Sequence, residues 1–196
     1  MGAPKTLYII QLLLLTAMAG SCVKAPDPWS PKTYPFEVRP YYKDSGALGP
    51  EWKRHEIKGM EENSFFFAHE SMEAVISVYF TCGKYQDIDL DMLAGHLAIP
   101  MGRRGEVITE KYLDHPRVDV YHLVAKGEYQ YHKETLYREE GLVPDLFGEM
   151  VIDAYVVGEP HCVVDLVYTA PPEVYEKGIP DFHDYLRSLN VPVDES

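Results

Sequence analysis

A pair of apolar runs joined by a tight turn near the end of the chain constrains the fold more than any other segment. The residues from Met150 to Val157 and from Cys162 to Thr169 are rich in β-branched and aromatic side chains, and Gly158-Glu159-Pro160 separates them. Two such runs with a short turn between them are typical of a β-hairpin. The sequence therefore predicts an antiparallel sheet that contains this hairpin.

Other runs of the same composition precede the hairpin. In the stretch from Glu73 to Thr81, apolar side chains alternate along the chain, which indicates a strand with one buried face. We expect five strands before the hairpin, at Trp52 to Lys58, Ser64 to Glu70, Glu73 to Thr81, Val107 to Leu113 and Val118 to Lys126. Residues 127 to 147 give no clear pattern and are interpreted as an insertion or an edge hairpin.

Two segments show the period of a helix instead. In the first, apolar residues recur at spacings of three and four, Asp87 or Asp89 can cap its start, and Pro100 marks that it has ended. In the second, Pro180 fits the first helical position. Their apolar stripes are Leu90, Leu93, Ala94, Leu97 and Ala98, and Phe182, Tyr185, Leu186 and Leu189. This order of elements predicts one α+β domain over residues 51 to 196, an antiparallel sheet sandwiched with helices.

The end of the domain carries a resemblance to a known family. The pattern from Val164 to Glu173, which leads into a helix with Phe182 and Ser188, resembles the PsbP-like fold of photosynthetic assembly proteins and their bacterial relatives. The stretch from Val78 to Cys82 is similar to a group of uncharacterised bacterial lipoproteins with a second cysteine in the last strand. The resemblance covers about residues 51 to 191. It implies an α/β/α sandwich and non-catalytic binding or assembly work on a membrane-associated complex.

The first 21 residues have the layout of a bacterial lipoprotein signal. Lys5 precedes an apolar run from Leu7 to Met18, and the small residues Ala19-Gly20-Ser21 stand directly before Cys22. This resembles the lipobox, where signal peptidase II cuts before a diacylated cysteine, so Cys22 is the expected site of lipidation, palmitate included. An apolar run of about a dozen residues is too short for a membrane span, which needs ~20. An ordinary cleaved signal is the alternative.

The residues after the signal indicate where the domain is held. Val23, not Asp, follows Cys22, which under the sorting rule of enteric bacteria favours the outer membrane, facing the periplasm. Residues 22 to 50 contain prolines at positions 26, 28, 31, 35, 40 and 50. Such a segment runs extended, with partial polyproline character. We interpret it as a tether between the lipid and the domain.

The net charge indicates which class of partner is excluded, and the cysteine content indicates which disulfide can form. The net charge of −13, one unit more negative once Lys5 is removed, repels phosphate backbones and argues against nucleic acid. With Cys22 committed to lipid, Cys82 and Cys162 remain as a pair. In an oxidising compartment they are expected to form a disulfide, and two buried thiols are the alternative.

No motif points to catalysis, a metal or a cofactor. The eight histidines, among them His69, His115, His122 and His161, contain no His-Glu-x-x-His arrangement and are scattered over different elements. Cys162 follows His161 directly, and neighbours on a strand point to opposite faces. There is no Gly-x-Ser-x-Gly for a nucleophilic serine. The turn Gly102-Arg103-Arg104-Gly105 lacks the ending of a phosphate loop. We therefore expect no enzyme.

The resulting hypothesis is a lipid-anchored envelope protein, a non-catalytic accessory or assembly subunit that binds protein or lipid. The first alternative is a periplasmic carrier of lipid or a small molecule. Its pocket would lie between sheet and helix, with Phe65, Phe66, Phe67 and Tyr79 as lining or contact residues. The second alternative is an unrecognised hydrolase.

Overall fold

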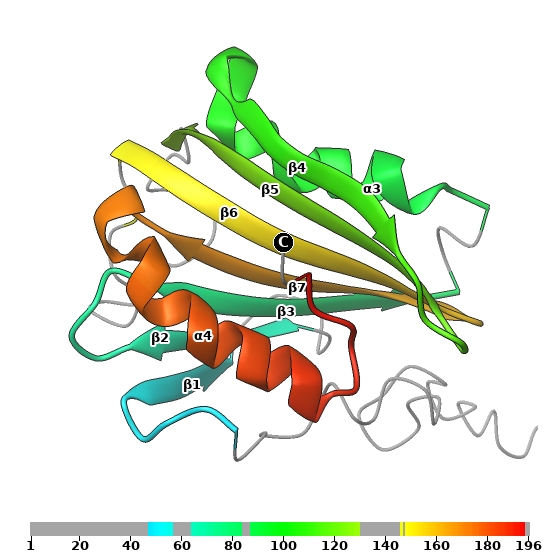
Figure 1. The fold of residues 1–196 in the computed structure, drawn as a ribbon, viewed down its shortest axis with the longest axis horizontal. Coiled ribbons are helices and arrows are strands. Elements are labelled where there is room, and N and C mark those ends of the chain that lie inside the picture. The colour runs from blue at the N-terminus through cyan, green and yellow to red at the C-terminus, as the bar shows by residue number, and fades with distance from the viewer. Residues whose placement is uncertain (1–46, 57–63, 84–86, 130–145, 147, 195–196) are drawn as a thin grey trace, which may run out of the picture.

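The predicted hairpin is the centre of a seven-stranded antiparallel sheet (Figure 1). The structure is a computed structural model that describes residues 47–56, 64–83, 87–129, 146 and 148–194. The hairpin strands are β6 (Gly148–Glu159) and β7 (Cys162–Ala170). The strand order across the sheet is β1-β2-β3-β7-β6-β5-β4. The other five strands are β1 (Trp52–Glu56), β2 (Ser64–His69), β3 (Val75–Cys82), β4 (Glu106–Leu113) and β5 (Asp119–Tyr129).

Side chains alternate between the two faces of the sheet because successive residues of a strand point in opposite directions. On β3, Ile76, Val78 and Phe80 join the larger core, whereas Val75 belongs to the opposite face. The same alternation on β6 places Tyr155 in the larger core and Ala154 in the core of the other face. Both faces of the central strands are therefore buried.

A helix packs on each face, as Figure 1 shows with α4 in front of the sheet and α3 behind it. Helix α4 (Pro172–Ser188) buries Phe182, Tyr185 and Leu186. Helix α3 (Leu90–Leu97) continues into a 3-10 helix, η2 (Ile99–Arg104), and the two cover β5 and β6. The predicted α+β class with an antiparallel sheet is confirmed. The sheet dominates the fold, so a sandwich between helices describes it only loosely.

Helix α4 begins earlier than the sequence predicted. It starts at Pro172, and Pro180, the predicted first residue, lies inside it. Pro172 occupies the first turn, where a missing N–H costs nothing. Pro180 is exposed, so water can hydrate the carbonyl that its missing N–H leaves without a donor. Burial of the apolar stripe beyond it, which includes Phe182, stabilises the continuous helix.

The start of α3 agrees with the prediction in position but differs in detail. Asp89 is the N-cap residue, but its side chain makes no capping hydrogen bond. The carboxylate of Asp91 instead accepts a hydrogen bond of 2.7 Å from the backbone N–H of Met92. Helix α3 ends at Leu97, and Pro100 lies within η2.

Several predicted features fall outside the described residues. They are the signal peptide, the lipid attachment at Cys22, the tether up to residue 46, and most of the unclear stretch from 127 to 147. Within the described part of the chain, no helix is both long enough and apolar enough to cross a membrane.

Candidate functional site

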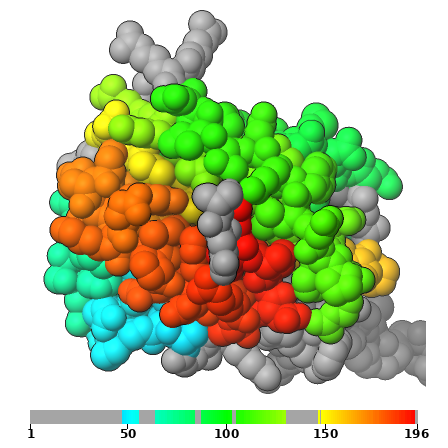
Figure 2. All heavy atoms as spheres, in the orientation of Figure 1, coloured from blue at the N-terminus to red at the C-terminus, as the bar shows by residue number. Residues whose placement is uncertain are grey.

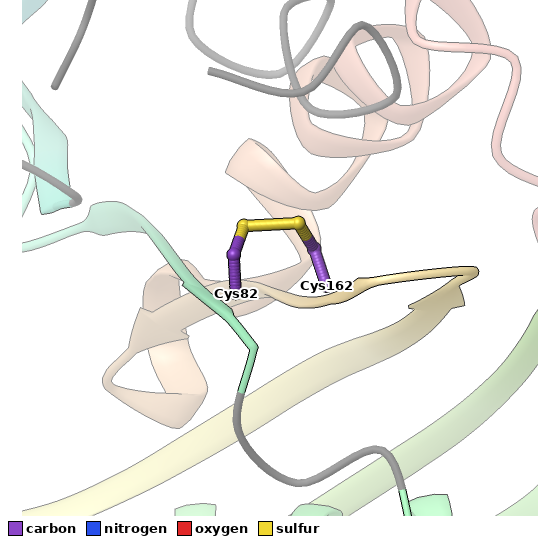
Figure 3. Close-up of a disulfide and its surroundings, with 2 residues drawn as sticks. All are labelled: Cys82 and Cys162. Carbon is purple, nitrogen blue, oxygen red and sulfur yellow. A yellow bond between two sulfur atoms is a disulfide. The ribbon is translucent and has the colours of Figure 1, made fainter. Parts of the chain in front are cut away.

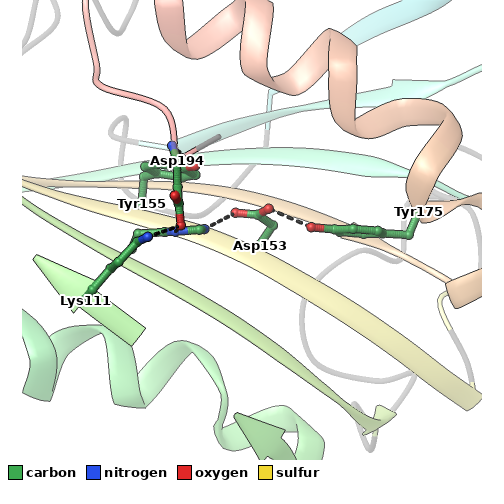
Figure 4. Close-up of polar contacts among 6 residues, drawn as sticks. Lys111, Asp153, Tyr155, Tyr175 and Asp194 are labelled. Carbon is green, nitrogen blue, oxygen red and sulfur yellow. Dashed lines mark hydrogen bonds and ion pairs between the residues drawn. The ribbon is translucent and has the colours of Figure 1, made fainter. Parts of the chain in front are cut away.

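Strand register brings a group of polar side chains together on the face that α4 covers. Lys111, His122 and Tyr155 are register partners on β4, β5 and β6, so they form a line across the sheet. Asp153 lies two residues before Tyr155 and points to the same face. Helix α4 adds Tyr175, and the segment after α4 adds Asp194, as Figure 4 shows. We name these six residues the polar cluster: Lys111, His122, Asp153, Tyr155, Tyr175 and Asp194.

A histidine between two aspartates is the centre of the polar cluster. His122 Nε2 lies 3.0 Å from Asp153 Oδ1, and its Nδ1 lies 3.2 Å from Asp194 Oδ2. The side chains of His122, Asp153 and Asp194 are 5%, 3% and 9% exposed. A neutral imidazole carries one N–H and can donate to only one carboxylate, whereas an imidazolium donates to both. The ring therefore joins the two aspartates, one on each of its nitrogens.

Further contacts balance the charge of the two carboxylates. Lys111 Nζ lies 2.7 Å from Asp194 Oδ2, and the hydroxyl of Tyr175 donates a hydrogen bond of 2.7 Å to Asp153 Oδ2. Buried charges need such partners, because an ionised group loses its hydration on burial. Each aspartate of the polar cluster thus has two partners.

The two tyrosines of the polar cluster remain protonated. Burial is the main cause that raises the pKa of Tyr175 and of Tyr155 far above the ordinary value, and the charge of Asp153 raises both further. The Tyr155 ring stacks on His122 with 4.3 Å between centroids, and its hydroxyl accepts a 3.2 Å hydrogen bond from the Asp194 backbone N–H. These phenols therefore act as fixed hydrogen-bonding groups and not as acids.

A second histidine, His183 on α4, lies beside the polar cluster without joining it. Its Nε2 atom is buried and has no hydrogen-bond partner among the described residues. Burial lowers the pKa of His183, and the nearby Asp153 charge opposes that shift. Among the residues that the structure describes, no three His, Cys, Asp or Glu side chains converge as a metal site would require.

The polar cluster fastens the end of the chain to the sheet. Asp194 contacts side chains of β4 and β5, and Val191 and Val193 of the same segment pack in the larger core. Figure 2 shows this segment, in red, between α4 in orange and the green part of the chain. The polar groups bind one another under this cover, so the arrangement suits a structural latch better than a reaction with a substrate.

The sequence pattern did not predict the polar cluster. His122 reads as one of several scattered histidines, because its partners lie on another strand and on the segment after α4 and meet it only in the fold.

 The two contacts of the ring show this directly, since Asp153 lies 31 residues and Asp194 lies 72 residues further along the chain. One signal was available, because Asp153 and His122 each interrupt a run of apolar residues that reads as a buried strand. A titratable residue in such a run needs a buried partner.

The predicted disulfide between Cys82 and Cys162 is confirmed (Figure 3). The two cysteines are register partners at the end of β3 and the start of β7. The pairing continues one step further, because the Gly83 N–H donates to the His161 carbonyl at 2.9 Å. The bond therefore fastens the central hairpin to β3 at the end of the sheet where α3 begins.

A pocket of about 590 Å³ opens at the same end of the sheet. The start of α3, the turn between β4 and β5 and the turn between β6 and β7 enclose it. We name it the loop-end pocket. Its charged, aromatic and sulfur-bearing lining residues are Asp89, Tyr112, His115, Arg117, Asp119, Glu159 and Cys162.

The aromatic residues proposed for a carrier pocket lie on different faces of the sheet. Phe65 and Phe67 belong to the core under α4, whereas Phe66 packs on the other face with Val75. None of the three phenylalanines is more than 4% exposed, and Tyr79, on the face of Phe66, is 40% exposed. These residues do not form a shared pocket between sheet and helix, because the phenylalanines fill two separate cores.

No family model matches the chain, and no curated protein matches it. Solved structures are similar to it, among them these two. The first is cyanobacterial PsbP (CyanoP) from Synechocystis, with 13% identity and a TM-score of 0.47 over 75% of this chain and 88% of that one. The second is a protein of unknown function, PA94, from Pseudomonas aeruginosa, with 9% identity and a TM-score of 0.46 over 74% of this chain and 99% of that one. At these values, neither protein says what this chain binds.

Proposed function

We propose that this chain is a lipid-anchored accessory subunit of a cell-envelope complex and that it works by binding a protein partner, not by catalysis. The observation that carries the proposal is a set of exposed apolar side chains on α3 and the residue stretch before it, on η2 and on β4. We name it the α3–β4 surface. It consists of Ile88, Met92, Ile99, Val107, Ile108 and Tyr112, which are between 37% and 66% exposed.

Helix α3 explains why this surface is unusual. Leu90 and Ala94 face the sheet and are buried, as expected for a helix that covers a core. Met92 of α3 is not buried with them but 63% exposed, and Ile99 of η2 is 66% exposed. Gathered apolar side chains on a surface mark binding sites more often than single ones do.

The polar cluster supports a role without catalysis. A general acid or base must reach the substrate within hydrogen-bond distance. His122 directs both of its ring nitrogens at Asp153 and Asp194, and the tyrosines bind the same cluster. Its polar groups therefore stabilise the fold that presents the α3–β4 surface.

The anchor is part of the proposal. Lipid chains on Cys22 would hold the protein at the outer membrane, and residues 22 to 50 would give the domain reach from it. More than one acyl chain is needed for stable anchoring. Intact-mass spectrometry of membrane-extracted protein tests this part, because a diacyl or triacyl mass on a chain that begins at Cys22 supports it. A chain that begins at Met1 without lipid would contradict it.

The binding role is tested by the size of the detergent-extracted protein on native electrophoresis. We expect the natural chain to migrate in a complex and the double variant Met92→Gln/Ile99→Gln to migrate as a monomer. The matched control is Glu173→Gln/Glu176→Gln, which alters exposed positions of α4 on the other face. Migration of the natural chain as a monomer would contradict a role as a subunit.

A further inference from the structure

We propose that the α3–β4 surface binds a basic, amphipathic helix of a partner protein and that the loop-end pocket receives a cationic side chain from it. This inference rests on the proposed function and specifies the chemistry of the partner. Ile88 and Tyr112 belong to the surface and also line the pocket, so the two features are continuous. A single partner segment can therefore occupy both.

The apolar part of the surface favours a helix as the occupant. Met92 lies on α3, Ile99 begins η2 and Ile88 precedes the helix, so exposed apolar side chains occur along the length of α3 and η2. Gly95 follows Met92 by three residues on α3, and no atom of the described residues lies within 4 Å of the position that a Cβ would take there. The missing side chain leaves room for the side chains of a second helix to pack against α3.

Addition of a partner strand to the sheet is less suitable. Strand β4 is at the end of the strand order, and its pairing with β5 shifts between Val107 and Thr109. Such an irregularity bends an edge strand and interrupts the regular row of backbone groups that a new strand would need. Side-chain contacts along α3 and β4 are the better match.

Carboxylates surround the apolar side chains. Asp87, Asp89 and Asp91 are exposed at the start of α3. Glu110 is exposed on the same side of β4, where the hydroxyl of Tyr121 donates to it at 3.4 Å. An apolar strip with an acidic rim is complementary to a helix with an apolar face flanked by lysine or arginine. The same carboxylates would repel anionic lipids and nucleic acids.

The loop-end pocket adds a place for one cationic side chain. Three of its lining residues are acidic, namely Asp89, Asp119 and Glu159, against one arginine, Arg117. The Nδ1 atom of His115 accepts a 3.4 Å hydrogen bond from the Arg117 backbone N–H. The excess of carboxylates favours a lysine or arginine of the partner over an acidic residue.

The test measures binding of fluorescent synthetic peptides to the full chain by anisotropy. One peptide has leucines and lysines at helical spacing over about five turns. A second has glutamate in place of lysine, and a third has the leucines and lysines in scrambled order. Three variants are compared with the natural chain: Met92→Gln/Ile99→Gln, Asp89→Asn/Asp119→Asn and, as the control, Glu173→Gln/Glu176→Gln. The control removes the same number of charges as the pocket variant, but on α4.

We expect only the ordered leucine–lysine peptide to bind. The Met92→Gln/Ile99→Gln variant should weaken that binding about tenfold or more, and Asp89→Asn/Asp119→Asn about three- to tenfold with a smaller salt dependence. The control should change binding less than about twofold. Equal weakening by the control and the pocket variant would mean attraction by net charge alone and would overturn the proposal. Preference for the glutamate peptide would also overturn it.

Two further outcomes separate this inference from the proposed function. If no peptide binds but the native complex still depends on Met92 and Ile99, the partner chemistry is wrong and the accessory role stands. If the complex does not depend on them either, both proposals fail. Binding of anionic vesicles that is lost in Met92→Gln/Ile99→Gln would assign the surface to a membrane and would overturn a protein partner.

Discussion

His122 and Asp153 lie on adjacent strands with 3.0 Å between Nε2 and Oδ1, and each side chain is at most 5% exposed. The pair joins β5 to β6, and through Tyr175 and Asp194 it also joins the sheet to α4 and to the end of the chain. Removing one member of a buried hydrogen-bonded pair leaves the polar atom of the other without a partner. The stability of the whole α4 side of the fold therefore depends on it.

Substitution of Asp153 tests this dependence. We expect Asp153→Ala to lower the free energy of unfolding by about 3–5 kcal/mol, measured by urea denaturation. The control is Asp184→Ala, which removes an exposed partner of Arg187 and should cost less than about 1 kcal/mol. Equal effects of the two substitutions would contradict a stabilising role of the buried His122–Asp153 pair.

The disulfide should contribute strongly to stability. It joins residues 80 positions apart, and the chain-entropy argument gives on the order of 4 kcal/mol for a loop of this size. We expect a reducing agent to lower the free energy of unfolding of the natural chain by this amount, measured by urea denaturation. The variant Cys82→Ser/Cys162→Ser should already have the lower free energy of unfolding and should not respond to the reductant. A natural chain that does not respond would indicate free thiols.

Asp165 should make stability depend on pH. Burial raises the pKa of this carboxyl from 3.8 to about 7 in the fold. Between these values the folded chain binds more protons than the unfolded chain, so stability falls as the pH rises and is lowest above about 7. The free energy of unfolding of Asp165→Asn, relative to that of the natural chain, should therefore rise by on the order of 2 kcal/mol between pH 5 and pH 8. Parallel pH profiles of the two proteins would show that the pKa is not raised.

The stability of the fold should depend on a glycine at position 178, because the Tyr168 side chain lies against it. A Cβ at this position would collide with the Tyr168 hydroxyl, although alanine is ordinarily the better helix former. We expect Gly178→Ala to lower the free energy of unfolding by about 1–3 kcal/mol, measured by urea denaturation. The loss should be smaller in a Tyr168→Phe background, because that change removes the hydroxyl oxygen. Gly95→Ala on α3 is the control. It has open space and should be neutral or stabilising, and a similar loss at both glycines would exclude the steric cause.

Much of the fold could be predicted, because alternation along strands and the spacing of apolar residues are local properties. The hairpin of β6 and β7 is an example, since its runs and turn are adjacent in the chain. The start of α4 could not be predicted from the sequence, because packing of Phe182 on the sheet outweighs the local preference of Pro180 to begin a helix. The polar cluster needed register information, since Lys111 and His122 meet only when β4 pairs with β5.

The exposed surface on α3 was also beyond sequence reasoning. The pattern identified Leu90 and Ala94 as an inward face, but Met92 becomes informative only once the other side of the helix is seen to be exposed. Position in the fold, not residue type, makes this methionine a candidate contact.

The most direct test of the binding role is site-specific photo-crosslinking in intact cells. A crosslinking residue is placed at Met92 or Val107 on the α3–β4 surface, and at Glu176 or Lys177 on α4 as controls. We expect one crosslinked product of defined mass from both surface positions, absent from the α4 positions and lost when Ile99→Gln is added. Products of equal yield from all four positions, or from none, would contradict the account of this chain as a subunit that binds through α3 and β4.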